Sequence, residues 1–342
     1  MEEILIQCLS SFYGWNDAMQ VESIGGGLIN HTWKITRSDE TYVFQQINKN
    51  IFKQPEWIDE NVMMLSDYLQ SACPDYLFTN PVVGTNDKTI FMLDGEYYRC
   101  FRFIPRSHTI DVVQHPQQAY EAAFQFGKFT SVLNNFDAIK LHITLPDFHN
   151  LGLRFEQLQK ALQNGNTERI AETKNDVLLL QSHQTIVEKW KGFVSHKDAK
   201  QRVTHHDTKI SNVLFDANDR GICVIDLDTI MAGYFISDVG DMMRTYLSPV
   251  SEEESDYNKI IVRKAFLEAI RNGYLAAIEN DLSSFEKDHF YFSGEVLIYM
   301  QALRFLTDYI NDDIYYGRKY EKHNLVRARN QIRLLEEYLK AI

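Results

Sequence analysis

The feature that most constrains the fold of this chain is the segment 203–228, where polar residues flank two short apolar runs. Asp207 and Asn212 precede the first run, the turn-forming sequence 218–221 follows it, and the second run ends in Asp226. Two short apolar runs joined by a turn predict a β-hairpin. Such a hairpin brings the three polar side chains to one end, where they can act on a single ligand.

Phosphoryl transfer from a nucleotide requires a set of this kind. A carboxylate, here Asp207, positions the attacking hydroxyl, while an amide and a second carboxylate, here Asn212 and Asp226, hold Mg²⁺ on the phosphates. The spacing His-x-Asp-x-x-x-x-Asn, followed by an acid at the end of the next strand, matches the catalytic loop and metal acid of protein kinases. A lone His-x-Asp pair is usually structural, so the prediction depends on the complete set. Lys209 is expected to offset charge on the transferring phosphoryl group, and His205 to orient the loop.

The segment 203–228 resembles the aminoglycoside phosphotransferase and choline kinase group, the small-molecule branch of the protein-kinase-like fold. It differs from protein kinases in three ways: Asp226 is followed by Leu-Asp, no Ala-Pro-Glu segment follows, and His206 stands where arginine is usual. The runs HHDTKISNVLF, VIDLDTIMAG and DVGDMMR look closest to the N-acetylhexosamine 1-kinases. The similarity continues in the amino-terminal glycines, in Phe148-His149-Asn150 and in a carboxy-terminal Arg/Tyr pair.

This resemblance implies an α+β, two-lobed fold. A small antiparallel lobe, residues 1–104, would bind the nucleotide, and a larger, mostly helical lobe, residues 105–342, would hold the catalytic and acceptor sites. The residue pattern predicts strands at 21–24, 32–35, 42–47, 89–92 and 97–103, and a helix from Pro55. It predicts helices at 116–135, 152–163, 168–192, 284–310 and 320–341, and a further helix from a capping box at Ser251 to about Glu279.

Gly25, Gly26 and Gly27 lie between the first two expected strands. Glycines let backbone N–H groups approach phosphate oxygens without interference from a Cβ. Three glycines alone would equally suit a hairpin turn, but this position in a kinase-like lobe favours a phosphate-covering loop. The nucleotide is expected at the hinge between the lobes, against Phe101 and Phe103.

The third expected strand departs from the kinase pattern. It lacks the lysine that normally contacts the α- and β-phosphates, and Lys49 is too far along to replace it. Either Gln45 or Gln46 donates a neutral hydrogen bond, or a residue elsewhere acts instead. Glu60, on the following helix, is the candidate partner of this strand. The missing lysine favours an inactive nucleotide-binding relative, and the intact catalytic set favours an enzyme.

The acceptor site is expected near the carboxy terminus. An aminoglycoside would require a strongly acidic cleft and a quaternary amine a tryptophan-rich cage, whereas Arg304 and Tyr315 suit an uncharged, hydroxylated ligand. By resemblance these two residues contact an N-acetylhexosamine, and His31 reaches it from the glycine turn. Arg304 and Asp308 are also spaced for a simple surface ion pair. Asp228 is expected as a second metal ligand or as the acceptor of a sugar hydroxyl.

Composition excludes several classes of protein. A hydrophobic content of 44% supports a real core, and a net charge of −12 argues against binding to nucleic acid or an anionic membrane. The four cysteines are scattered and are expected as buried free thiols. No apolar run approaches the length of a membrane span, and no signal-peptide pattern opens the sequence, so we expect a cytoplasmic protein. The oligomeric state stays open.

Together these features predict an ATP- and Mg²⁺-dependent kinase of N-acetylhexosamines that yields the sugar 1-phosphate. Two alternatives remain at this stage: a kinase of an amino alcohol or a different sugar, and an inactive kinase-like nucleotide-binding protein.

Overall fold

Five antiparallel strands form the sheet of the amino-terminal lobe, in the order β1-β2-β3-β5-β4. They are β1 (Met19–Ser23), β2 (His31–Arg37), β3 (Glu40–Ile47), β4 (Ile90–Leu93) and β5 (Glu96–Arg102). The computed structural model describes residues 2–24 and 30–342. All five expected strands are confirmed to within a few residues.

The two faces of this sheet differ because side chains alternate along each strand. One face carries apolar residues such as Phe44 and Cys100, which pack under helix α1 (Glu2–Tyr13). The opposite face carries Gln45 and Arg99, and it is turned toward the second lobe. The polar side chains of the sheet therefore lie at the junction of the two lobes.

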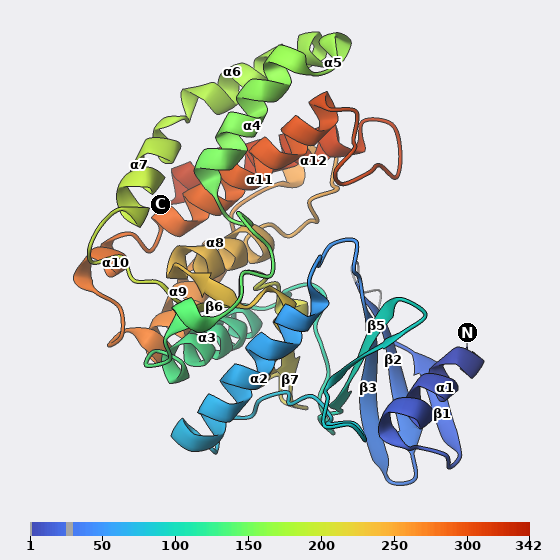
Figure 1. The fold of residues 1–342 in the computed structure, drawn as a ribbon. Helices are drawn as coiled ribbons and strands as arrows, with labels where there is room; N and C mark the ends of the chain where they lie inside the picture. Colours follow the sequence, from blue (N-terminus) through green and yellow to red (C-terminus); the bar gives the residue numbers. More distant parts are fainter. Residues whose placement is uncertain (1, 25–29) are drawn as a thin grey trace.

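Helix α2 (Pro55–Ala72) links the two lobes. Near its start, Ile58 packs with Ile47 and Phe52 of the amino-terminal lobe. Further along, Val62, Leu65 and Leu69 belong to the core of the larger lobe. Figure 1 shows this helix running from the sheet to the base of the helical lobe.

The carboxy-terminal lobe is mostly helical. Its core is built by α3 (Pro116–Val132), α8 (Phe235–Tyr246), α9 (Lys264–Ile278), α11 (Phe292–Ile310) and α12 (His323–Ala341). Helices α4 (Leu151–Asn164), α5 (Thr167–Glu172), α6 (Lys174–Ser182) and α7 (Thr185–Val194) lie beside α11 and α12, and α10 (Ser284–Asp288) precedes α11. Two short pairs, β6 (Arg202–Thr204) with β9 (Met231–Gly233) and β7 (Val213–Phe215) with β8 (Gly221–Val224), carry the catalytic segment. The α+β, two-lobed kinase-like fold class is thus confirmed.

The predicted helix from Ser251 to Glu279 is wrong in its first half. Residues 251–263 are irregular apart from one 3₁₀ turn, and the helix begins at Lys264. Ser251 does make a local turn, since its hydroxyl accepts from the backbone N–H of Glu253. The side chain of Glu252, however, is held by Arg244 and Arg327, so ion pairs with distant segments override the local capping signal.

Two other predicted helices are interrupted. The stretch 168–192 is divided into α5, α6 and α7 by breaks at Thr173 and at 183–184, and 284–310 is broken at 289–291. Within residues 2–24 and 30–342, no helix is both long and apolar enough to cross a membrane.

The packing of α3 against α9 depends on glycine. A Cβ added at Gly273 would lie 2.2 Å from the backbone oxygen of Tyr120, whereas a Cβ at Gly192 in α7 would meet nothing within 4 Å. We therefore expect Gly273→Ala to reduce the free energy of unfolding by about 1–3 kcal/mol. Gly192→Ala, the matched control, should raise it by up to about 1 kcal/mol because alanine is the better helix former. Denaturant unfolding of both variants measures this, and equal effects would contradict it.

Candidate active site

The catalytic loop is held from beneath by the first turns of α8. Asp238 accepts hydrogen bonds from the backbone N–H groups of His205 and His206, at 3.1 and 2.7 Å. Asp241 accepts from the N–H of Thr208 at 2.9 Å. Asp238 and Asp241 therefore hold the backbone of this loop in place.

His205 orients the loop and takes no part in the open site. It is buried, its Nε2 lies 2.9 Å from the backbone oxygen of Ile225, and its Nδ1 accepts from the N–H of Asp207 at 3.3 Å. Because Nδ1 accepts, the proton is on Nε2 and points to Ile225. This fits the orienting role predicted for it.

Asp207 and Lys209 form an ion pair at the mouth of the site, with Nζ 2.9 Å from Oδ2. Burial alone would raise the pKa of Asp207, but the adjacent ammonium group outweighs it and leaves this pKa below its usual range. Burial likewise opposes the charge on Lys209, yet Asp207 and Asp226 raise its pKa. Asp207 is therefore an ionised carboxylate, able to accept a hydrogen bond from a hydroxyl.

Asp226 lies two residues beyond the end of β8, in a left-handed conformation with φ at +61°. Burial, together with the nearby carboxylate of Asp228, raises the pKa of Asp226 to about 7, and Lys209 opposes this only in part. The site thus carries negative charge that its own lysine does not balance.

The donor chemistry here fits a magnesium ion bound together with phosphates. The described residues contain no cluster of three or more His, Cys, Asp or Glu side chains arranged for a metal. Asn212 donates its amide N–H to the backbone oxygen of Asp207 at 2.8 Å, and its Oδ1 receives no hydrogen bond within the described part of the chain. Asp226 and Asn212 would supply two hard oxygen ligands, with phosphate and water completing the shell. Such an ion, when bound, neutralises phosphate charge.

Asp228 joins the two lobes. It is 3% exposed, it forms an ion pair with Arg99, and it accepts from the side chain of Asn30 at 2.7 Å. Gln45, opposite Arg99 in the sheet, accepts from Nε and Nη2 of that arginine at 3.1 and 2.9 Å. Both carboxylate oxygens of Asp228 are thus engaged by the amino-terminal lobe, and Asp228 does not line the acceptor cavity described below.

Arg99 was not identified from the sequence. The one available signal was a basic residue alternating with aromatic residues in a strand expected to be half-buried. The proposed partnership of Glu60 with the third strand is wrong, because Glu60 lies 2.6 Å from His142 instead. Gln46 is also turned away, since it donates to Glu96 on the other side of the sheet.

The expected nucleotide-binding residues lie partly within the described structure. Phe101 shares a face with Arg99, whose guanidinium lies 5.0 Å from its ring centroid, and Phe103 follows β5 with Lys34 5.6 Å from its ring. His31 is exposed at the start of β2, next to Asn30. Gly25, Gly26 and Gly27 lie outside the described residues.

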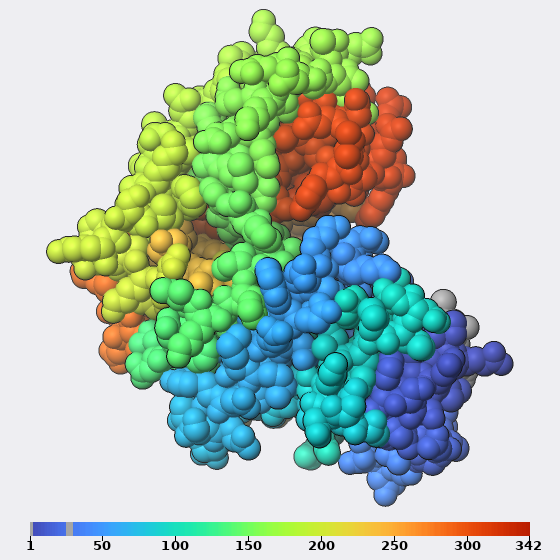
Figure 2. Space-filling model, in the orientation of Figure 1, coloured from blue at the N-terminus to red at the C-terminus, as the bar shows by residue number. Residues whose placement is uncertain are grey.

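A cavity of about 1730 Å³ opens from the catalytic loop into the helical lobe. Asp207 and Lys209 lie on its wall together with Arg304 and Tyr315, so the structure brings these predicted site residues to one space. Figure 2 shows the surface hollowed where the amino-terminal lobe, in blue, faces the carboxy-terminal helices, in red. The volume exceeds the roughly 300–1,000 Å³ of a typical small-molecule pocket.

The wall of this cavity is nearly balanced in charge. Its basic residues are Lys53, Lys209, Arg244, Arg304, Arg318, Lys319 and Arg327. Its acidic residues are Asp207, Asp241, Glu252, Glu253, Asp308 and Asp312. This is not the strongly acidic surface that a polycation requires.

Arg304 stands among aromatic rings. Its guanidinium lies 5.5 Å from the ring centroid of Phe148, 5.9 Å from that of Tyr315 and 5.4 Å from that of Tyr316. Asp308 is not its ion-pair partner, because that carboxylate accepts from the backbone N–H groups of Tyr315 and Tyr316 at 2.7 and 3.0 Å. The surface ion pair considered from the sequence is therefore absent, and Arg304 faces the cavity.

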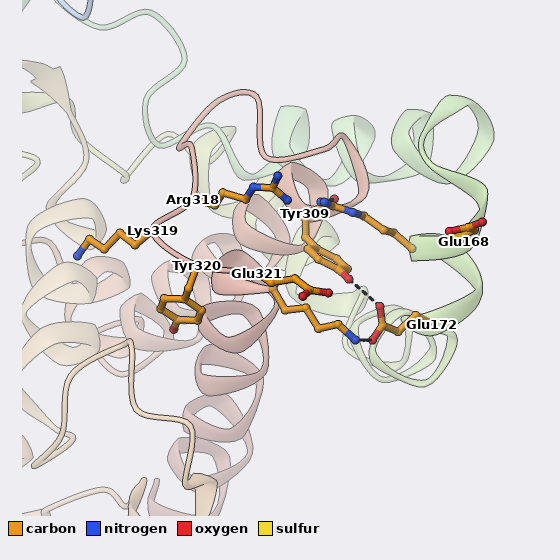
Figure 3. Close-up of a pocket in the computed structure, with 9 residues that line it drawn as sticks. Glu168, Glu172, Tyr309, Arg318, Lys319, Tyr320 and Glu321 are labelled. Atoms are coloured by element: carbon orange, nitrogen blue, oxygen red, sulfur yellow. Dashed lines mark hydrogen bonds and ion pairs between the residues drawn. The ribbon is translucent and has the colours of Figure 1, made fainter.

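A smaller cavity of about 630 Å³ lies between α5 and the segment 318–322 (Figure 3). Several of its charged groups are already paired: Glu172 binds both Lys322 and the hydroxyl of Tyr309, and Arg169 pairs with Asp313. It contains none of the catalytic set.

The sequence of this chain matches a known protein family. Residues 20–280 match the model of the phosphotransferase enzyme family (APH), which covers more than half of the chain. The chain belongs to this family. It is therefore a small-molecule phosphotransferase by family.

Several solved structures have the same fold. A microcompartment-associated aminopropanol kinase superimposes with a TM-score of 0.68 at 14% identity, covering 99% of this chain and 98% of that one. A spectinomycin phosphotransferase in complex with ADP and spectinomycin gives 0.60 at 12% identity, covering 99% and 98%. A choline kinase from Cryptosporidium parvum gives 0.60 at 13% identity, covering 99% and 97%.

The raised pKa of Asp226 predicts a pH-dependent affinity for Mg²⁺. Below about pH 7 the carboxyl group holds a proton that the ion must displace, so affinity in the presence of ADP should fall by up to about tenfold per pH unit and level off above pH 7. Calorimetric titrations between about pH 5.5 and 8.5 test this. Asp226→Asn is the control, since it removes the titration of this carboxyl group and keeps that of the nucleotide. A wild-type profile no steeper than that of the variant would contradict the prediction.

Proposed function

We propose that this protein transfers the γ-phosphate of ATP to the anomeric hydroxyl of an N-acetylhexosamine, giving the sugar 1-phosphate. The observation that carries this proposal is the cavity that joins Asp207 to Arg304 and its aromatic neighbours, with a nearly balanced wall. Cationic acceptors would be repelled by Arg304, and of the described residues on the wall none is a tryptophan that could form a cage for a quaternary amine.

Each group at the reaction centre has a role in this proposal. Asp207 accepts the hydrogen bond of the attacking hydroxyl and takes its proton late, and Lys209 offsets charge on the phosphoryl group. Asn212 and Asp226 hold Mg²⁺ on the phosphates. These roles extend the kinase-like arrangement to a sugar hydroxyl.

The remaining groups bind nucleotide and acceptor. In this proposal Phe101 and Phe103 bind the adenine, Gly25, Gly26 and Gly27 bind the phosphates, and His31 binds the acceptor. Asp228 acts mainly by fixing Arg99 and Asn30, and any contact of its own with the acceptor requires the lobes to move.

The assay is ADP release with a panel of sugars and amino alcohols, and Asp207→Asn is the inactive control. Turnover should be confined to N-acetylhexosamines, with phosphorus–proton coupling that places phosphate on the anomeric oxygen. Phosphate on the 6-hydroxyl, or turnover of amino alcohols alone, would assign a different kinase. Tight nucleotide binding with no turnover would support the inactive relative.

Arg304 should contribute to acceptor binding alone. Arg304→Ala should raise the KM for the sugar about tenfold or more, because losing a charged hydrogen bond costs roughly 1.5–3 kcal/mol. The KM for ATP should be unchanged, since the nucleotide lies on the other side of Asp207. Arg333→Ala, on the surface of α12, is the matched control. Equal changes in both constants would indicate general destabilisation.

Arg99 is the proposed substitute for the missing lysine. Its Nη1 has no hydrogen-bond partner in the described structure, but it is sealed from solvent, so donation to a phosphate oxygen requires the surrounding groups to move. This arginine also lies directly opposite Gln45 in the register of β3 and β5.

Substitutions at Arg99 and Gln45 test whether Arg99 contacts the phosphates. Arg99→Gln should raise the KM for ATP about tenfold or more, and Gln45→Lys combined with Arg99→Gln should recover part of the loss because it returns a cation to the same face. Thermal unfolding of both variants separates affinity from stability. A change in stability with the KM for ATP unaltered would make Arg99 only a link between the lobes.

A further inference from the structure

The hydroxyl of Ser237 stands between two imidazole rings. Its Oγ lies 2.7 Å from Nδ1 of His206 and is also in hydrogen-bonding contact with Nδ1 of His149. A serine hydroxyl has one proton, so it donates to only one of these nitrogens. The other nitrogen must carry a proton and donate to Ser237.

The surroundings of His206 determine which of the two histidines accepts the proton of Ser237. Its ring is buried, and its Nε2 faces the backbone oxygens of Met231 and Ala232 without completing a well-formed hydrogen bond in the described structure. A Cβ at Gly233 would lie 2.6 Å from this nitrogen, so the space beyond it is closed. An unprotonated Nε2 would place its lone pair against the lone pairs of these carbonyl oxygens, which is repulsive. Nε2 of His206 therefore carries the proton. Nδ1 of His206 is then bare and accepts from Ser237.

Neither ring carries two protons near neutral pH. Burial, and then the neighbouring His205, lower the pKa of His206 to about 3. Burial lowers the pKa of His149 well below its ordinary value, and the nearby cations, including Arg304, lower it further. One arrangement remains: Nδ1 of His149 holds the proton and donates to Ser237, which donates to His206.

The other nitrogen of His149 is open to the acceptor cavity. His149 is partly buried and lies on the wall of the cavity with Asp207 and Arg304. Its Nε2 makes no hydrogen bond within residues 2–24 and 30–342, and it is not among the sealed polar atoms. Its ring stacks on Phe148, with centroids 4.4 Å apart and planes at 15°, and Arg304 lies over the same phenyl ring.

We propose that His149 determines acceptor specificity by presenting a bare Nε2 that accepts a hydrogen bond from an N–H or O–H group. This assignment rests on the proposed function, because it requires the acceptor to occupy this cavity. The wall then offers a fixed cationic donor, Arg304, near a fixed neutral acceptor, His149. An acetamido group has a carbonyl oxygen for the first and an N–H for the second. Ser237 and His206 are positioning residues, since they act only through His149.

The tautomer can be measured without any substrate. Long-range proton–nitrogen correlation spectra of the full-length, histidine-labelled protein report which ring nitrogen is protonated, and His149→Phe identifies its signals among the 11 histidines. We expect a protonated Nδ1 and a bare Nε2. A protonated Nε2 on His149 overturns the proposal. Ser237→Ala should release the constraint and mix the two tautomers, and an unchanged spectrum would refute the role of Ser237.

Kinetics test the contact with the acceptor. His149→Phe should raise the acceptor KM about tenfold or more, His149→Gln should raise it less because its amide oxygen can accept a similar hydrogen bond, and the KM for ATP should not change. His196→Phe is the matched control, since that ring stacks on Phe285 away from the cavity. An unchanged acceptor KM in His149→Phe overturns the specificity role.

An error in the proposed sugar substrate can be distinguished from an error in the role of His149. It would appear in the wild-type protein as absent turnover of hexosamines, and the same kinetic comparison would then use whichever alcohol the panel identifies. A raised KM for that alcohol in His149→Phe supports the role of His149, and an unchanged one overturns it.

Discussion

The relative position of the two lobes depends on a buried ion pair between Arg99 in β5 and Asp228, which follows the β7–β8 hairpin. Removing two charges from water costs several kcal/mol per ion, and the cost is recovered only where further hydrogen bonds satisfy both groups. Gln45 accepts from Nε and Nη2 of the arginine, whose Nη1 stays unpaired in the described structure, and Asn30 donates to the carboxylate. Because Asp228 follows Asp226 by two residues, the same contacts fix the candidate metal ligand relative to the sheet.

The catalytic loop needs equally firm support, because it adopts backbone conformations that its residues do not favour. His206 and Asp226 have φ values of +66° and +61°, and a non-glycine residue in such a conformation costs on the order of 1–3 kcal/mol. Asp238 offsets part of this by accepting two backbone hydrogen bonds, and its place in the first turn of α8 favours its negative charge. Burial nevertheless raises the pKa of Asp238 to about 6, so this carboxylate gains its proton at a higher pH than it would in the unfolded chain.

Features encoded by short spacings were predictable from the sequence. Asp207, Asn212 and Asp226 lie at one hairpin because turn and strand signals fix them locally. The helix predicted from Ser251 failed because Glu252 is engaged by Arg327, far away in the chain. Arg99 was missed for a related reason: its partner Asp228 lies 129 residues away, and no local pattern reports such a contact. The hydrogen bonds of Ser237 with His149 and His206 could not be predicted either, because the two histidines come from separate segments of the chain.

Helix α2 has a mechanical consequence. Its first turn packs in the core of the small lobe, and the rest of the helix packs in the core of the large lobe. The helix is therefore fixed to both lobes. The chain returns to the sheet between Leu77 and Pro81 and leaves it again after β5, so three segments of the chain join the lobes. Because α2 is held in both cores, any opening of the cleft must bend this helix or disturb the packing at one of its ends.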